Sequence, residues 1–170
     1  MKQLNLDRIS FLAPYQVALA GESAFCFTTD AGRHYEVGFI EDYTLEKENC
    51  YQFFISTPDE GQYPPDEKIR DTILAVLNEF FRLNEAAVLY ICDTSDGRQA
   101  VRSRLFKSWY EQYAEKLQFI CETVVFNFES ITYYASILIK KDSNATEGFL
   151  SAFHEFVSDV ITKIDAEHNQ

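Results

Sequence analysis

The sequence predicts an α+β fold with a single mixed or mainly antiparallel sheet, in the order β-β-β-α-β-α-β-β-α, with helices packed mostly on one face. Three observations favour this class. The first third of the chain alternates apolar and polar residues, as half-buried strands do. Residues 66–83 and 149–164 instead carry apolar residues at helical spacing. Two long strand patterns, 119–128 and 131–140, are separated by only two residues and predict a hairpin.

Length and composition fit a single domain spanning residues 1–170. The chain is 46% hydrophobic and 15% aromatic, which is too apolar for a disordered protein. We expect residues 1–14 to form an irregular arm and residues 165–170 a polar tail. The 27 acidic and 15 basic side chains give a net charge of -12. A surface this acidic repels phosphate backbones, which argues against general nucleic-acid binding.

The expected cellular location is inferred from the absence of membrane and signal segments and from the cysteines. No apolar run approaches the roughly 18 residues that span a bilayer, so we expect no membrane segment. The first residues, MKQLNLDRISFLAP, lack the apolar core of a signal peptide. The four cysteines form no CxxC pair and lie in strand-like runs, which indicates free buried thiols and no zinc site. We therefore expect a cytoplasmic protein that holds no metal and no cofactor.

The first third predicts an antiparallel meander. Residues 15–20 could form an initial strand. The runs 23–29 and 34–42 flank the turn sequence Asp-Ala-Gly-Arg and predict a β-hairpin. A third strand covers residues 50–56. The loop at 57–65 contains three prolines and a glycine, so it connects the meander to the next element without regular structure.

The rest of the chain alternates helices and strands. A helix begins at Asp66 and ends near Asn84. The following strand, residues 88–92, is apolar on both faces, which suits a central strand and leaves open that helices cover both faces of the sheet. A second helix starts after Gly97 and runs to about residue 115. The last helix is preceded by Asn144 and Glu147 at the spacing of a capping box.

The candidate site is the corner where strand 88–92 meets the helix that follows it. At about 100° per residue, Arg98 and Arg102 lie within the apolar arc of this helix and Arg104 points outward. An unpaired inward cation costs several kcal/mol, so a negative group must lie nearby. The segment 98–107 carries four cations and no acid, which makes it the one locally basic segment of the chain.

The sequence leaves open what that negative group is. It could be a protein carboxylate, Asp93, Asp96 or Glu122, that ties the helix to the sheet, with Asp96 also capping the helix. It could be a bound anion, held by backbone amides and the two arginines. The corner could also be a protein–protein contact. The candidate binding residues are Asp93, Asp96, Gly97, Arg98 and Arg102.

Catalytic and metal motifs are missing from the sequence. Asp93 and Asp96 have the spacing DxxDG, whereas haloacid-dehalogenase-type phosphatases carry DxDG. The two aspartates also lack a third ligand at suitable spacing for a metal. There is no P-loop, GxGxxG, GxSxG or HExxH. We therefore name no catalytic residue.

The most specific block of the sequence is Asp96-Gly97-Arg98-Gln99, followed by Arg102-x-Arg104-Leu105-Phe106 and Trp109. Together with the hairpin pattern at 25–39, this block resembles an uncharacterised domain-of-unknown-function family of Bacteroidetes bacteria, DUF6169. The resemblance would cover nearly the whole chain. It implies a small cytosolic domain with no established activity and supplies no mechanism.

We expect a non-enzymatic binding or interaction module that uses the corner at 93–104, with a protein or an anionic small molecule as its partner. One alternative is an enzyme acting on a phosphorylated or carboxylated small molecule. Arg98 and Arg102 would then clamp the anion, and Asp93 or Asp96 would be the base. Another alternative is a component of a toxin–antitoxin or defence pair, with the acidic surface facing a basic partner.

Overall fold

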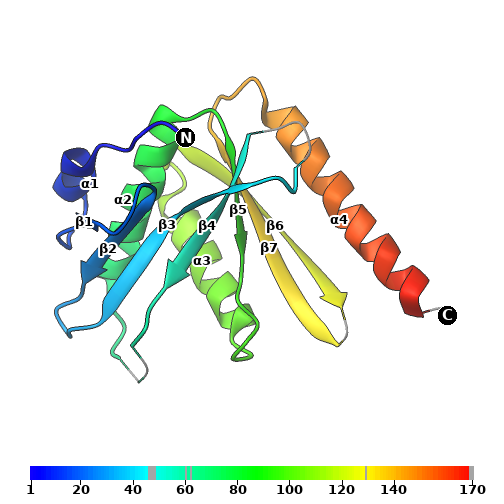
Figure 1. Cartoon of the computed structure of the whole chain (residues 1–170), viewed down its shortest axis with the longest axis horizontal. Coiled ribbons are helices and arrows are strands. Elements are labelled where there is room, and N and C mark those ends of the chain that lie inside the picture. The colour runs from blue at the N-terminus through cyan, green and yellow to red at the C-terminus, as the bar shows by residue number, and fades with distance from the viewer. Residues whose placement is uncertain (46–48, 60, 62, 129, 169–170) are drawn as a thin grey trace. The chain divides into compact units, whose positions relative to one another are not determined.

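The computed structural model describes residues 1–45, 49–59, 61, 63–128 and 130–168 (Figure 1). These residues contain one seven-stranded mixed sheet with the strand order β1-β2-β3-β4-β5-β7-β6. The predicted α+β class with one sheet is confirmed. The elements are α1 (Leu6–Leu12), β1 (Ala18–Leu19), β2 (Ala24–Thr28), β3 (His34–Asp42), β4 (Cys50–Ser56), α2 (Glu67–Leu83), β5 (Ala87–Ile91), α3 (Gln99–Tyr113), β6 (Phe119–Phe128), β7 (Ile131–Lys140) and α4 (Thr146–His168).

The chain divides into two compact units. The first unit contains residues 1–40 and 53–85, and the second contains residues 41–52 and 86–170. Strands β3 and β4 each contribute residues to both units. That the whole chain behaves as one domain stays a prediction.

The core of the first unit forms where the meander meets α2. Strands β1, β2 and β3 pair in antiparallel fashion, and Phe25 of β2 lies opposite Val37 of β3. Phe39 of β3 stacks on Phe80 of α2, with ring centroids 4.3 Å apart. The strands approach closely at Gly38, where a Cβ atom would lie 2.5 Å from the carbonyl oxygen of Ser23. Only glycine fits this position without a shift of the backbone.

Residues 1–14, predicted to be an irregular arm, include the helix α1. Asn5 caps this helix by accepting a hydrogen bond from the Arg8 backbone N–H at 2.9 Å. The helix is anchored by Glu79 of α2, whose fully buried side chain accepts hydrogen bonds from the Asn5 backbone N–H at 3.2 Å and from Arg82 at 2.8 Å. The Arg8 guanidinium completes an ion pair with Glu79 at 3.3 Å. The contacts that join α1 to Glu79 are long-range, so the local sequence pattern did not reveal the helix.

The second unit is built on three neighbouring strands. β5 pairs in parallel with β4, and Tyr51 lies opposite Val88. On its other side β5 pairs in antiparallel fashion with β7. The predicted hairpin of residues 119–128 and 131–140 is confirmed with the same bounds, in an unbroken register from Phe119 opposite Lys140 to Phe128 opposite Ile131. Ser130 turns the chain with a φ of 67°.

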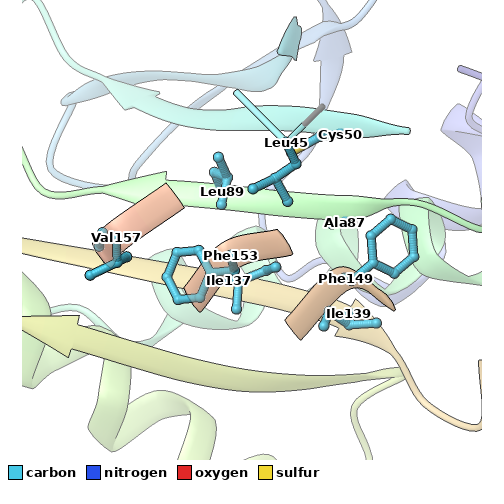
Figure 2. Packing of buried hydrophobic residues seen from close by; sticks show 10 residues of the cluster. Leu45, Cys50, Ala87, Leu89, Ile137, Ile139, Phe149, Phe153 and Val157 are labelled. Carbon is cyan, nitrogen blue, oxygen red and sulfur yellow. The ribbon is translucent and has the colours of Figure 1, made fainter. Parts of the chain in front are cut away.

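Helices α3 and α4 pack on opposite faces of the second unit. Figure 2 shows Phe149, Phe153 and Val157 of α4 over alternate side chains of β5 and β7. Tyr90, which projects to the other face of β5, contacts Phe106 of α3 at a centroid distance of 5.0 Å. Within this unit the two helices cover both faces of β5 and β7, an arrangement that the sequence had left open. Strand β5 is apolar on both faces, and each face needs its own cover.

The C-terminal helix is longer than predicted. Residues 165–168, expected to be part of a polar tail, continue α4 to His168. Polar composition alone does not end a helix, and Ala166 and Glu167 are good helix formers. Residues 169–170 of the expected tail lie outside the described residues.

Candidate binding surface on helix α3

The predicted corner lies between the end of β5 and the start of α3, within the second unit. Asp93 closes the turn by accepting hydrogen bonds from the Ser95 backbone N–H at 2.9 Å and the Ser95 hydroxyl at 2.7 Å. These two bonds lower the pKa of Asp93. Gly97 has a φ of 70°, and its N–H donates to the Thr94 carbonyl at 3.2 Å. A glycine suits this position because residues with a side chain rarely adopt a positive φ.

Arg102 ties this corner together. Its guanidinium donates two hydrogen bonds to the Asp96 carboxylate, at 2.7 and 2.8 Å, and a third to the Asp93 backbone carbonyl at 3.0 Å. The hydrogen bonds from Arg102 and from the Arg98 backbone N–H lower the pKa of Asp96 to about 2. The protein therefore supplies the negative counterpart for Arg102, and the guanidinium is occupied.

Asp96 does not cap the helix as expected. The N-cap residue of α3 is Arg98, which makes no capping hydrogen bond through its side chain. Asp96, two residues before this N-cap, accepts a hydrogen bond from the Arg98 backbone N–H at 3.0 Å. The Asp96 carboxylate, which lies before the helix, thus binds the backbone of the N-cap residue and not an N–H group inside the helix.

Arg98 is exposed, so the prediction that it points inward is wrong. Among the described residues its guanidinium makes no hydrogen bond or ion pair. The packed face of α3 centres on Phe106, which is buried, and includes Tyr110, which stacks on Phe119. The apolar arc expected from the sequence also contained Val101 and Leu105. Both are in fact about half exposed, at 52% and 50%.

Four exposed residues therefore share one side of α3. We call Arg98, Val101, Arg104 and Leu105 the α3 surface. Val101 lies three residues from each arginine and four from Leu105, so it neighbours all three on the helix. Lys107 is also exposed but lies 3.8 Å from Glu111. The basic character of segment 98–107 was visible in the sequence, whereas the exposure of the two aliphatic residues was not.

The corner offers little acid–base or nucleophilic chemistry. Both aspartates have lowered pKa values and are ionised at neutral pH. Burial raises the pKa of the Cys92 thiol to about 11, so this thiol is protonated at neutral pH. Burial likewise raises the pKa of Cys121 to about 11 and that of Cys50 to about 12. Within the described residues, no three His, Cys, Asp or Glu side chains are grouped so that they could hold a metal ion.

A second polar cluster, which the sequence did not indicate, lies in the first unit. The Tyr15 hydroxyl donates to Asp66 at 2.5 Å and accepts from the Asp30 backbone N–H at 3.2 Å. Lys68 bonds to the Asp30 carboxylate at 2.5 Å. These hydrogen bonds connect the hairpin to the start of α2. The cluster belongs to a stack of aromatic rings and cations that contains Lys68, Tyr15, Phe27, Tyr35, Arg33 and Tyr63.

Over the residues that the structure describes, no helix combines the length and the apolar character that a bilayer crossing requires.

The fold and the α3 surface define a small α+β protein that presents basic and aliphatic side chains together on one helix. The chain belongs to DUF6169, a family of unknown function, whose model matches residues 65–155. The match runs from just before α2 into α4 and includes α3, but it does not include β1–β4. It is therefore narrower than the coverage that the resemblance implied. No curated protein and no solved structure matches the chain.

Proposed function

We propose that this protein is a non-enzymatic binding module whose α3 surface docks an acidic protein partner. The observation that carries the proposal is the exposure of Val101 and Leu105, at 52% and 50%, between the exposed Arg98 and Arg104. Interfaces commonly combine an apolar centre with a charged rim. The cytoplasmic setting and the Bacteroidetes origin that the resemblance implies are part of the same proposal.

Charge favours an acidic partner. The chain as a whole has a net charge of -12, so most of its surface repels an acidic protein. Segment 98–107 carries four cations and no acid, and two of these cations are on the α3 surface. A partner with acidic residues around an apolar side chain would be attracted here and oriented by repulsion elsewhere.

The internal pairing of Arg102 argues against a small-anion site. A bound anion would require Arg98 and Arg102 to converge on it, yet Arg102 is already held by Asp96 and by the Asp93 carbonyl. Breaking that bidentate pair to bind a free anion would sacrifice charge-assisted hydrogen bonds. Asp93, Asp96 and Gly97 accordingly have a supporting role, because they position the first turn of α3.

No observation favours the enzymatic alternative. It requires Asp93 or Asp96 to act as a base, but both carboxylates already accept hydrogen bonds within the corner. Their lowered pKa values make them weak bases at neutral pH.

The proposal is tested with the full-length protein as bait in native extract, followed by quantitative mass spectrometry. We expect an acidic protein that the wild type captures and that Arg98→Glu and Val101→Ser each reduce by about tenfold or more. Lys163→Glu is the matched control, because Lys163 is an exposed cation on α4, and it should capture the partner as the wild type does.

Two outcomes would contradict the proposal. One is capture that neither α3 variant reduces. The other is a loss with Arg98→Glu but not with Val101→Ser, together with backbone NMR shifts at residues 93–98 on titration with inorganic phosphate. That second pattern would identify a small-anion site, since a phosphate ion makes no use of an aliphatic side chain.

A further inference from the structure

Strand β6 lies at one end of the sheet and has an open edge. The strand order finishes with β7 and then β6. β6 pairs with β7 along its whole length, Phe119 to Phe128, without interruption (Figure 1). Within the described part of the chain, no strand pairs with the other edge of β6.

The hydrogen bonds of β7 determine which backbone groups of β6 point to that open edge. The carbonyl of Tyr134 in β7 accepts from the Cys92 N–H at 3.1 Å and so points toward β5. Directions alternate in an antiparallel ladder, so Ala135 points toward β6, where it lies opposite Val124. Every second residue of β6 counted from Val124 therefore bonds to β7. The residues between them turn their N–H and C=O groups outward, and Cys121, Thr123, Val125 and Asn127 are among these residues.

The open edge lacks the devices that normally prevent strand pairing. Exposed edges of soluble proteins are usually short, interrupted by a bulge, or protected by lysine or proline. β6 has ten residues, an unbroken register, and neither proline nor a basic residue. Its one charged side chain, Glu122, pairs with His154 of α4. Val125, which is 55% exposed, adds an uncovered aliphatic side chain beside the outward-pointing backbone.

We propose that β6 pairs in antiparallel fashion with β6 of a second copy of this chain, about a two-fold axis at Thr123. The two sheets then continue into one another across a homodimer. In this register Thr123 lies opposite the partner's Thr123, and Cys121 lies opposite the partner's Val125. In this register, each residue whose backbone groups point outward lies opposite a residue of the partner whose backbone groups also point outward. The N–H and C=O groups of the two strands can therefore form hydrogen bonds with one another.

The side chains of β6 are complementary to themselves in this register. Ile120 lies opposite the partner's Phe126, Cys121 opposite the partner's Val125, and Thr123 opposite the partner's Thr123. Apolar pairs of this kind and Thr–Thr pairs are among the favourable cross-strand combinations. The exposed Val125 of each copy lies beside the partner's Cys121. This self-complementarity selects a second copy over an unrelated strand.

The charge of β6 also suits two copies of the same chain. Two molecules that each carry a net charge of -12 repel one another over most of their surfaces. Strand β6 contributes only Glu122, which lies opposite the partner's Val124 and not opposite another acid. The two copies therefore meet along a stretch where their like charges are sparse.

Analytical ultracentrifugation of the full chain tests the dimer. We expect a species of twice 19.7 kDa that dissociates on dilution. Val125→Lys should raise the dissociation constant by roughly tenfold or more, because it places a cation in both halves of the paired edge. Ile40→Lys is the control, since Ile40 is an equally exposed aliphatic residue on β3, and it should leave the constant unchanged. A single-chain mass at every concentration, or a dimer that Val125→Lys does not weaken, would overturn the proposal.

A disulfide test checks the register independently. Directly opposed residues of a hydrogen-bonded antiparallel pair have Cα atoms about 5.5 Å apart, which is within disulfide range. Thr123→Cys should therefore form a covalent dimer under mild air oxidation. Asn127→Cys should not, because Asn127 lies opposite the partner's Phe119. Equal cross-linking of the two variants, or none with Thr123→Cys, would contradict the proposed axis.

Discussion

Asp96 and Arg102 show how one ion pair can define a corner of the fold. The Asp96 carboxylate accepts hydrogen bonds from both the Arg102 side chain and the Arg98 backbone, so it links the turn to the first turn of α3. The sequence showed that a cation at position 102 needed a negative counterpart. It could not select among Asp93, Asp96 and Glu122, because that choice depends on how the turn at 93–97 folds.

The lowered pKa of Asp96 predicts a pH dependence of stability. Its pKa falls from an ordinary 3.8 to about 2 in the folded state. A lowered folded-state pKa stabilises the protein above the unfolded-state pKa, and this contribution is lost as the pH falls toward the folded-state value. We therefore expect the wild type to be more stable than Asp96→Asn at pH 5, and the difference to shrink between about pH 4 and pH 2.

Urea denaturation at several pH values measures this difference. Asp159→Asn serves as the control, since Asp159 is an exposed carboxylate on α4, and it should show no comparable trend. A stability difference between wild type and Asp96→Asn that stays constant down to pH 2 would show that the ion pair does not hold in solution.

At the scale of elements, strands were easier to predict than helix faces. The bounds of β3, β4, β6 and β7 agree with the sequence prediction, because runs rich in β-branched and aromatic residues, bounded by charged or turn residues, are typical of strands. Helix α1 was missed because its anchor, Glu79, is more than 70 residues away. Burial alone would raise the pKa of Glu79, but hydrogen bonds from Arg82 and Asn5 outweigh it and lower the pKa, which keeps the anchor charged.

The orientation of α3 could not be read from its composition. Its aliphatic residues Val101 and Leu105 look like core residues on a helical wheel, yet the aromatic residues Phe106 and Tyr110 make the packing contacts. A short amphipathic helix with several large residues has more than one plausible buried face. The tertiary contacts with Tyr90 and Phe119 decide between them.

Alanine substitutions at neighbouring positions test this orientation. Phe106→Ala should destabilise the protein by about 3–4 kcal/mol, because it leaves a cavity beneath α3. Leu105→Ala should cost less than about 1 kcal/mol, because the side chain is already half exposed. Chemical denaturation gives both values. The reverse order would show that Leu105, and not Phe106, lies in the core, and would remove the α3 surface.

At the scale of the whole molecule, the two compact units raise the question of cooperativity. Strands β3 and β4 each contribute residues to both units, so a unit that unfolded alone would disrupt both strands. We therefore expect a single unfolding transition. The length and composition of the sequence are consistent with one cooperative transition. The sequence also has no linker between the two units.

Two probes with different coverage test that expectation. Trp109, the one tryptophan of the chain, lies in α3 and reports on the second unit. Far-ultraviolet circular dichroism reports on helices and strands of both units. The two urea curves should have the same midpoint and slope. Separate midpoints would show that the units unfold one after the other.

The protonated thiols of Cys50, Cys92 and Cys121 make the protein convenient for site-specific labelling. With pKa values of about 11 to 12, these three side chains contain almost no thiolate at neutral pH. Maleimide dyes and spin labels react with the thiolate, so the native residues should react slowly. A cysteine introduced at an exposed position would then take up the dye before these three thiols do, and replacing the partly buried Cys26 would leave a single fast-reacting site.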